Sequence, residues 1–473
     1  MLFNSFEFAI FLPVVFLLYW FVFNQSLKIQ NFFLLIVGYI FYGWWDWRFL
    51  FLIAFSTTLD FSVGLLLEKT ENTKNRKGLF ILSCLINLGF LGAFKYYNFF
   101  IDNFISAFEH IGYHIPVLPL KIILPVGISF YTFQSLSYTA DVYSRKMKAE
   151  HDFISFAAFI SFFPQLVAGP IERARHLLPQ FKTQRSFDFD MAKKGLLKML
   201  WGFFKKIVIA DSLAVYVDDI FFHYQHLPAS TLVIGAIYFA IQIYCDFSGY
   251  SSIAIGTAKL FGFSLMENFS FPYFSKNVAE FWRRWHISLS TWFRDYVYIP
   301  LGGSYGSKTK TIVNILITFT LSGFWHGANW TFIAWGFLNG LFILPTTLLS
   351  KKKNSDEKKR LPSFIDILQM TGTFLLITLT WIFFRSENMA SAMHYIHHIL
   401  SPSIFSYPVQ HGMLLAIPLI TILFSVEWIQ KNDIIILSRN AIPVYARWSI
   451  YLITALTCLA FFKQNQTFIY FQF

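Results

Sequence analysis

Charged side chains are scarce in this sequence of 473 residues. Asp, Glu, Lys and Arg make up 14% of it, whereas 56% of the residues are hydrophobic and 21% are aromatic. Soluble domains carry about 25% charged residues, so the composition argues against a soluble protein. Apolar runs long enough to cross about 30 Å of hydrocarbon recur along the chain, and the alternating strands of an outer-membrane barrel are absent. The sequence therefore predicts an all-α polytopic membrane protein.

Cysteine is also rare, and occurs only as Cys84, Cys245 and Cys458. All three lie in apolar surroundings and are too scattered for a disulfide framework or a metal site, so we expect them to pack as small hydrophobic side chains. Phosphate-binding glycine loops and the G-x-S-x-G element do not occur in the strand context that they need. These absences argue against nucleotide hydrolysis and against a serine-hydrolase site.

An excess of basic residues gives the chain a net charge of +12, and these residues gather in loops between apolar runs. This pattern is typical of cytoplasmic loops in membrane proteins and not of a nucleic-acid surface. The loops at 68–78, 173–206 and 351–360 are therefore predicted to be cytoplasmic, with the N-terminus outside. No Lys or Arg precedes Phe8 and no small-residue cleavage site follows, so we expect the first apolar run to remain as a span.

The apolar pattern predicts about eleven transmembrane or re-entrant helices. We interpret residues 1–473 as a single membrane domain with a functional core at about 120–340. Between Asp141 and Gly340, polar and helix-breaking residues interrupt the apolar pattern, and at membrane depth such residues persist only where they line a cavity or are buried in protein. The expected spans and half-spans lie near 6–23, 30–44, 49–67, 79–97, 121–140, 153–168, 197–216, 231–260, 311–348 (two expected), 366–384, 412–427 and 447–462.

His326 is the main candidate for chemistry. It lies in the apolar run ITFTLSGFWHGANWTFIAWGF, where a histidine is costly unless it is used or hydrogen-bonded. Burial favours the neutral imidazole, which can accept a proton. In a continuous helix Ser322 and Asn329 would share its face, and Gly323 and Gly327 would let a neighbouring helix or a substrate chain approach. The alternative interpretation is a structural histidine that bonds a neighbouring helix.

A second candidate region is EFWRRWHISLSTWFRDYVYIPLGG at 280–303. As one helix it would carry an aromatic stripe beside a polar stripe, typical of an interfacial or re-entrant segment. Such a helix is either a membrane-surface anchor or the mouth of a tunnel, with His286 in the site. In the second case the arginines would meet the phosphates of a donor. The candidate binding residues of this region are Arg283, Arg284, Ser290 and Arg294.

Other polar residues give weaker signals. Asp141 and Asp246 lie in or near apolar runs, and each is expected to form an ion pair with a core arginine, with catalysis as the alternative. His394, His397 and His398 have a spacing that suits a metal on a helix, but no fourth ligand is evident. We therefore predict no metal site.

These segments resemble the membrane-bound O-acyltransferase (MBOAT) superfamily. The resemblance rests on WRRWHISLSTWFRDYVYIPLGG followed by SGFWHGANWTFIAWG, which place His286 and His326 forty residues apart. Further segments are similar to its bacterial alginate O-acetyltransferase branch, so that the match covers most of the chain. These are ILPVGISFYTFQSLSYTADVYS, FISFFPQLVAGPIER, YCDFSGYSSIAIGTAKLFGF, WIFFRS and the terminal FIYFQF.

The resemblance implies a ring of helices around a tunnel, with His326 as the catalytic histidine and His286 as the second histidine of the core. Trp325 and Asn329, beside His326, then become candidate substrate-binding residues. The implied reaction is acyl transfer from acetyl-CoA or another thioester to an exported polysaccharide such as alginate, in the bacterial inner membrane and without a bound cofactor. The implied partners are an SGNH-type protein outside the cytoplasm, polysaccharide export machinery and membrane lipid.

Three other functions are compatible with the residues. Within the enzyme class the alternative is D-alanyl transfer to teichoic acid. Outside it, His326, Asp246 and Asp141 would form a relay in a proton-coupled transporter, although no inverted repeat is visible. The third is a non-catalytic scaffold for polysaccharide export.

Overall fold

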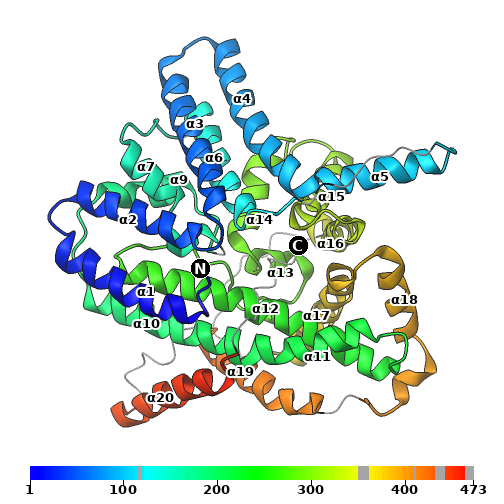
Figure 1. Cartoon of the computed structure of the whole chain (residues 1–473). Helices are drawn as coiled ribbons and strands as arrows, with labels where there is room; N and C mark the ends of the chain where they lie inside the picture. Colours follow the sequence, from blue (N-terminus) through cyan, green and yellow to red (C-terminus); the bar gives the residue numbers. More distant parts are fainter. Residues whose placement is uncertain are drawn as a thin grey trace. The chain divides into compact units, whose positions relative to one another are not determined.

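The structure is a computed structural model that describes residues 1–113, 120, 122–167, 169–349, 362–409, 412–431 and 443–463. All regular elements in these ranges are helices (Figure 1), so the predicted all-α fold is confirmed. By length and composition, seven helices within these described ranges are able to cross a membrane. They are Trp47–Lys69, Thr73–Glu109, Ala229–Leu260, Trp330–Leu348, Phe364–Arg385, Met413–Gln430 and Val444–Phe461, and the shorter apolar helices are Phe6–Val22, Leu27–Gly43 and Phe153–Leu166. The predicted basic loop at 351–360 and the terminal FIYFQF lie outside the described residues.

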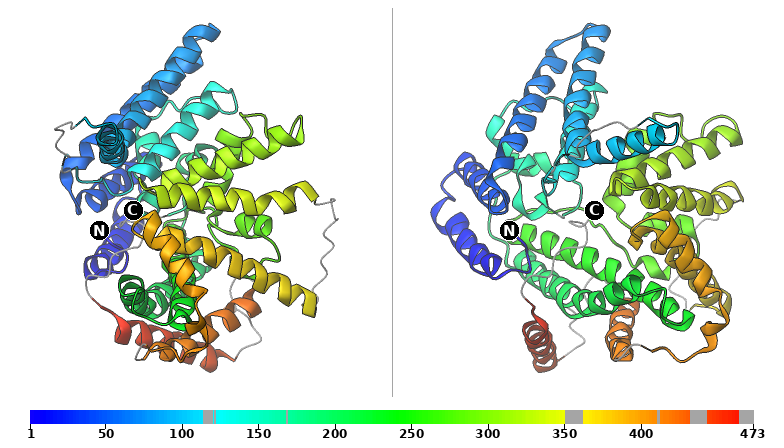
Figure 2. Two further views of the ribbon diagram at one scale, coloured as in Figure 1. Left: turned by 90° about the vertical axis from the view of Figure 1, so that its right-hand side faces the viewer. Right: turned by 45° about the vertical axis from the view of Figure 1, so that its right-hand side comes forward.

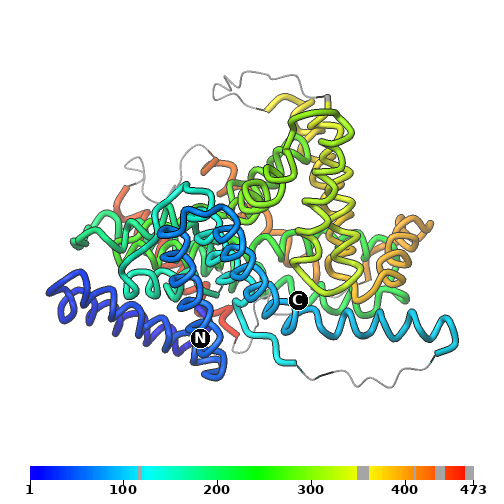
Figure 3. Tube along the Cα trace, turned by 90° about the horizontal axis from the view of Figure 1, so that it is seen from above, coloured from blue at the N-terminus to red at the C-terminus, as the bar shows by residue number. Residues whose placement is uncertain are grey.

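The chain divides into two compact units. Unit 1 comprises Met1–Leu196 and Ala254–Met266, and unit 2 comprises Leu197–Ile253 and Glu267–Phe473. In unit 1, α3 and α4 run antiparallel (Figure 1), and α5 continues from α4 at an angle (Figure 3). The main helices of unit 1 are α1 (Phe6–Leu17), α2 (Leu27–Gly43), α3 (Leu50–Lys69), α4 (Thr73–Leu91), α5 (Tyr97–Glu109), α6 (Ile128–Tyr143) and α7 (Phe153–Ile160).

Buried hydrogen bonds join the helices of unit 1. The fully buried carboxylate of Asp60 on α3 accepts bonds from Ser83 (2.5 Å) and Asn87 (2.9 Å) on α4. It also accepts bonds from Ser135 and Thr139 on α6. These donors replace water around a carboxylate that would otherwise be costly in an apolar span, so they fix α3, α4 and α6 together.

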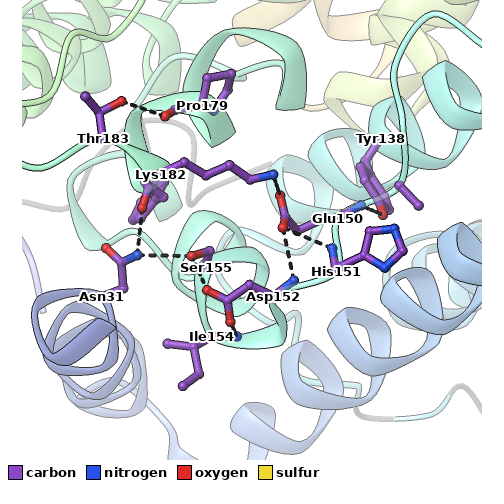
Figure 4. A network of polar contacts seen from close by, with 12 residues as sticks. Asn31, Tyr138, Glu150, His151, Asp152, Ile154, Ser155, Pro179, Lys182 and Thr183 are labelled. Carbon is purple, nitrogen blue, oxygen red and sulfur yellow. Dashed lines mark hydrogen bonds and ion pairs between the residues drawn. The ribbon is translucent and has the colours of Figure 1, made fainter. Parts of the chain in front are cut away.

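A polar network fixes the loop between α6 and α7 (Figure 4). Lys182 forms an ion pair of 2.8 Å with the buried carboxylate of Glu150, whose other oxygen accepts the backbone N–H groups of the next two residues. Asn31 on α2 donates to Ser155 on α7 (3.0 Å). Nearby, Arg175 forms an ion pair of 2.7 Å with Asp141, which confirms the predicted arginine bridge.

Unit 2 contains both candidate histidines. The helical segment from α10 through η5 into α11 is followed by α12, and the region predicted to hold two helices at 311–348 is confirmed as α15 and α16. A buried ion pair of 2.7 Å joins Asp246 on α12 to Lys206 on η5, so the bridge exists but the predicted arginine is wrong. Two helices belong partly to unit 1, namely α10 (Phe189–Phe203) and α12 (Ala229–Leu260). The other elements are η5 (Phe204–Ala210), α11 (Asp211–Phe222), α13 (Val278–Arg284), α14 (Ile287–Phe293), α15 (Lys308–His326), α16 (Trp330–Leu349), α17 (Phe364–Arg385), α18 (Met389–Ile399), α19 (Ile417–Gln430) and α20 (Val444–Phe461).

Helices α15 and α16 lie side by side as a hairpin (Figure 2). Two glycines allow this close approach, because a Cβ atom on Gly323 would lie 2.2 Å from the carbonyl oxygen of Phe332 and 3.0 Å from the Cα atom of Gly336. The predicted approach of a neighbouring helix at Gly323 is therefore confirmed. This contact holds the end of α15, and thus His326, against α16.

Gly323→Ala should destabilise the folded protein by about 1–3 kcal/mol, because backbone atoms must move to admit the methyl group. The measurement is the melting temperature of purified protein in detergent. Gly372→Ala on α17 is the matched control, since a Cβ atom there has nothing within 4 Å and alanine favours a helix. Equal melting temperatures for the two variants would contradict the close packing at Gly323.

Candidate functional site

His326 is the last residue of α15 and is 5% exposed. The backbone is extended at Gly327, and Asn329 precedes α16 with its side-chain oxygen accepting the N–H of Thr331 (3.0 Å). The amide of Asn329 donates to the carbonyl oxygen of Glu387 (2.7 Å). The prediction that Asn329 shares a helical face with His326 is therefore wrong, because the helix ends between them and the asparagine caps the next one.

His286 lies at a break between two short helices. Helix α13 ends at Arg284, α14 begins at Ile287, and His286 has φ 41° and ψ 55° in the left-handed region. The predicted single helix over 280–303 is therefore wrong. A left-handed conformation in a residue other than glycine costs about 1–3 kcal/mol and persists only where the surroundings impose it. Such strain is frequent at functional sites.

Asn268 imposes the conformation of this break. It is fully buried, and its carbonyl oxygen accepts the N–H of Ile287 (2.9 Å). Its side-chain oxygen accepts the hydroxyl of Ser288 (2.6 Å), and its amide donates to Ser251 on α12 (3.1 Å). One side chain thus ties the residues after His286 to α12, so Asn268 is a positioning residue that periodicity alone does not reveal.

The rings of the two histidines lie close together inside unit 2, tilted by 54° to each other. Their centroids are 6.4 Å apart, and His286 is 1% exposed. The Trp325 ring lies 4.9 Å from the His326 ring and 6.3 Å from the His286 ring. Burial lowers the pKa of His286, which lies outside the candidate spans, to about 3. At neutral pH its ring is therefore uncharged, because loss of water penalises the cation.

Aromatic side chains enclose the pair. Trp335 on α16 and Phe384 on α17 lie 5.1 and 5.4 Å from the His326 ring, and Phe247 on α12 lies 4.6 Å from the His286 ring. Beyond them Trp381 stacks on Trp335 at 5.4 Å. These rings exclude water, which strengthens electrostatic interactions within the site. Sequence patterns predict no role for these rings, although WIFFRS contains Trp381 and Phe384.

Arg284, Arg294 and Ser290 have polar partners other than the two histidines. Arg284 forms an ion pair with Glu280 (2.7 Å), and Arg294 forms one with Asp295 (2.8 Å). The hydroxyl of Ser290 donates to the carbonyl oxygen of Trp285 (3.2 Å). Arg283 is exposed, and among the described residues it has no ion pair. Of the three arginines, Arg283 is therefore the most available to an anionic ligand.

A buried neutral imidazole beside a second one suits proton transfer. A neutral imidazole is the form that accepts a proton from a hydroxyl, and aromatic rings pack around both histidines. Within the described part of the chain, no three His, Cys, Asp or Glu side chains are grouped as metal ligands. The rings of His394 and His398 lie 6.3 Å apart on α18.

Comparisons with known proteins identify the family of the chain. A model of the membrane-bound O-acyltransferase family matches residues 36–385. The chain is 41% identical over 394 residues to the probable alginate O-acetylase AlgI of Pseudomonas aeruginosa, covering 83% of this chain and 73% of the relative. It is 34% identical over 423 residues to the peptidoglycan O-acetyltransferase of Helicobacter pylori (83% and 78%). It is 29% identical over 288 residues to the teichoic acid D-alanyltransferase of Bacillus subtilis (57% and 70%).

Proposed function

This chain belongs to the membrane-bound O-acyltransferase family, and on that premise we propose that it transfers acetyl groups for the O-acetylation of an exported polysaccharide such as alginate. The proposal rests on one observation. The rings of His326 and His286 are buried among aromatic side chains, and their centroids are 6.4 Å apart. The relatives with about 40% identity are named alginate O-acetylases, which favours acetyl over other acyl groups. The protein is a multi-pass membrane O-acyltransferase. We propose in addition that the acceptor is a polysaccharide and that the donor is acetyl-CoA.

In the proposed reaction His326 is the proton acceptor. Its neutral ring takes the proton of the acceptor hydroxyl as the hydroxyl oxygen attacks the thioester carbonyl carbon. The tetrahedral intermediate then collapses, the C–S bond breaks, and the imidazolium returns the proton to the thiolate. General-base assistance of this kind contributes about 10²–10⁴-fold. The His286 ring lies 6.4 Å from the His326 ring. Because it is neutral, it is able to hydrogen-bond a reactant without repelling the imidazolium that forms at His326.

Acetyl-CoA is the proposed donor, and it reaches the site from the cytoplasm. Its phosphates do not enter hydrocarbon, so they remain at a basic surface while the pantetheine arm extends inward. Arg283 is the proposed phosphate contact, because it is exposed and has no ion pair within the described residues. Arg283→Gln should raise the KM for acetyl-CoA more than it lowers kcat. Arg294→Gln is the control, since Arg294 already has a carboxylate partner.

The proposed location is the bacterial inner membrane with the N-terminus outside. The basic turn between α3 and α4 then faces the cytoplasm. A Glu71→Cys protein should react with an impermeant thiol reagent only after the cells are permeabilised, and labelling in intact cells would reject this orientation.

A separate SGNH-type protein outside the membrane is the proposed partner, and its co-purification with the full-length chain tests this.

The second candidate is D-alanyl transfer, which the similarity to teichoic acid D-alanyltransferases favours. Purified protein in nanodiscs separates the two candidates. The proposal predicts His326-dependent release of free CoA from acetyl-CoA in the presence of a hydroxyl acceptor. Consumption of a D-alanyl carrier-protein thioester, with acetyl-CoA untouched, would replace acetyl transfer by D-alanyl transfer.

A further inference from the structure

Helix α19 follows the segment that the family model matches, which ends at residue 385 (Figure 1). Its Glu427 is nevertheless only 2% exposed, in the interior of unit 2. A carboxylate within an apolar candidate span is costly unless neighbouring groups satisfy it. The hydroxyl of Tyr244 on α12 donates to the Oε1 atom of Glu427 over 2.7 Å. This bond therefore ties α19 to the centre of the unit.

A positive charge lies near the same tyrosine. Lys205 on η5 is 5% exposed, and its ammonium lies 5.8 Å from the centre of the Tyr244 ring. Its Nζ atom lies 3.4 Å from the hydroxyl oxygen of Ser252 on α12. Buried charged groups are often no more stabilising than apolar side chains of the same volume. Stability is therefore a weak reason for these groups, whereas the direction of the Tyr244 bond offers a better one.

The Tyr244 ring forms part of the wall around Trp285, the residue directly before His286. The centroids of the Tyr244 and Trp285 rings are 6.0 Å apart, and Trp285 is 1% exposed. Because Trp285 and His286 are consecutive, a shift of the Trp285 ring moves the strained backbone that carries the His286 ring. Three further rings lie 5.0–5.4 Å from Trp285, namely those of Phe269, Phe281 and Trp381.

The same tryptophan is connected to His326 through packed rings. The Trp381 ring lies 5.0 Å from Trp285 and 5.4 Å from Trp335. The Trp335 ring in turn lies 5.1 Å from the His326 ring. Trp285 is thus joined to one histidine by the main chain and to the other by two rings. Close-packed side chains transmit displacements, because they have little free volume around them.

We propose that Glu427 is a positioning residue for acyl transfer. Its carboxylate fixes the Tyr244 ring, the Tyr244 ring fixes Trp285, and Trp285 sets the separation of His286 and His326. A misplacement of about 1 Å in an active site can cost about 10²-fold in rate. The proposal rests on the proposed function, since it assumes that both histidines take part in transfer. It adds a dependence on a helix that lies beyond the matched segment.

Tyr244→Phe tests the proposal, because it removes the hydroxyl that Glu427 accepts and keeps the ring. The assay is the release of CoA from acetyl-CoA by purified full-length protein in nanodiscs with a hydroxyl acceptor. We expect kcat to fall about tenfold and the KM for acetyl-CoA to stay within about twofold of the wild type. Glu427→Gln should retain most of kcat, because its amide oxygen still accepts the hydroxyl.

The matched control is Tyr238→Phe on the same helix. Tyr238 is 3% exposed, and its hydroxyl donates over 2.6 Å to the backbone carbonyl oxygen of Met413, shortly before α19. Tyr238→Phe therefore also removes a buried hydrogen bond between α12 and the C-terminal region. It should lower the melting temperature about as much as Tyr244→Phe does, and it should keep the wild-type kcat.

A triple variant separates positioning from stability. It combines Lys205→Met, Tyr244→Phe and Glu427→Leu, and so replaces both buried charges and the hydroxyl by apolar groups. Its melting temperature should recover to about the wild-type value or above, as expected when a buried charged group is replaced as a whole. Its kcat should remain as low as that of Tyr244→Phe, because the bond that directs the ring is still absent.

Two results would overturn the proposal. A kcat for Tyr244→Phe no lower than that for Tyr238→Phe would mean that the hydroxyl does not set the geometry of the site. Recovery of kcat together with the melting temperature in the triple variant would mean that Glu427 serves the fold alone. Wild-type protein without His326-dependent release of CoA would instead reject acetyl transfer, and the same comparisons then use the thioester that the wild type consumes.

Discussion

His326→Gln should lower acetyl transfer by about 10²-fold or more, the scale of general-base assistance. Glutamine keeps much of the volume of the ring and a hydrogen-bonding group, but it is not basic enough to take a proton from a hydroxyl. The measurement is the O-acetyl content of the exported polymer in cells that contain matched amounts of each protein. A histidine with a purely structural role would tolerate this substitution, so wild-type acetylation would reject the assignment.

The folded protein should survive the loss of His326. The residue ends α15, and the helix contact at Gly323 and Gly336 does not involve its ring. His326→Ala should therefore reach the membrane in normal amounts and be as inactive as His326→Gln. Trp335 contacts the same ring, and Trp335→Phe, which keeps an aromatic wall, serves as a matched control that should retain most of the activity.

The second large effect is expected at His286. His286→Gly should lower acetyl transfer by about 10²-fold, because the ring that faces His326 is lost. His286→Ala should be equally inactive but less stable than His286→Gly, because alanine keeps the strain at φ 41° that glycine relieves. The difference is expected to be about 1 kcal/mol.

Melting temperatures and transfer rates, measured on the same preparations, separate the two effects at His286. Both variants remove the same ring, so the difference in stability between them reports the backbone strain that glycine relieves, less the higher entropy of glycine in the unfolded chain. An alanine variant that is more stable than the glycine variant would contradict the left-handed conformation. A glycine variant with wild-type activity would show that the ring has no part in the reaction.

Local sequence patterns predicted the helices well and the backbone of the site poorly. The apolar run around His326 predicted two helices at 311–348, and α15 and α16 are found there. The prediction that His326 and Asn329 share a helical face was wrong, because periodicity assumes one continuous helix. Gly327 directly after His326 is a helix-stop signal, and Asn329 two residues later is a helix-start signal, so this break was present in the sequence.

The break at His286 has no such local signal. Periodicity over 280–303 fits one amphipathic helix, and the left-handed turn depends on Asn268, eighteen residues earlier in the chain, and on Ser251 on α12. Such contacts between distant residues override local preference. For the same reason the aromatic enclosure became visible only in the structure, since Phe247, Trp335 and Phe384 come from three different helices.

The most direct test of the central claim uses inside-out membrane vesicles and acetyl-CoA labelled in the acetyl group. If the protein is an O-acetyltransferase with His326 as its proton acceptor, wild-type vesicles should incorporate the label into base-labile esters. His326→Gln vesicles with the same amount of protein should incorporate about 1% of that label or less. Equal incorporation by the two kinds of vesicle, or no His326-dependent ester at all, would contradict the account.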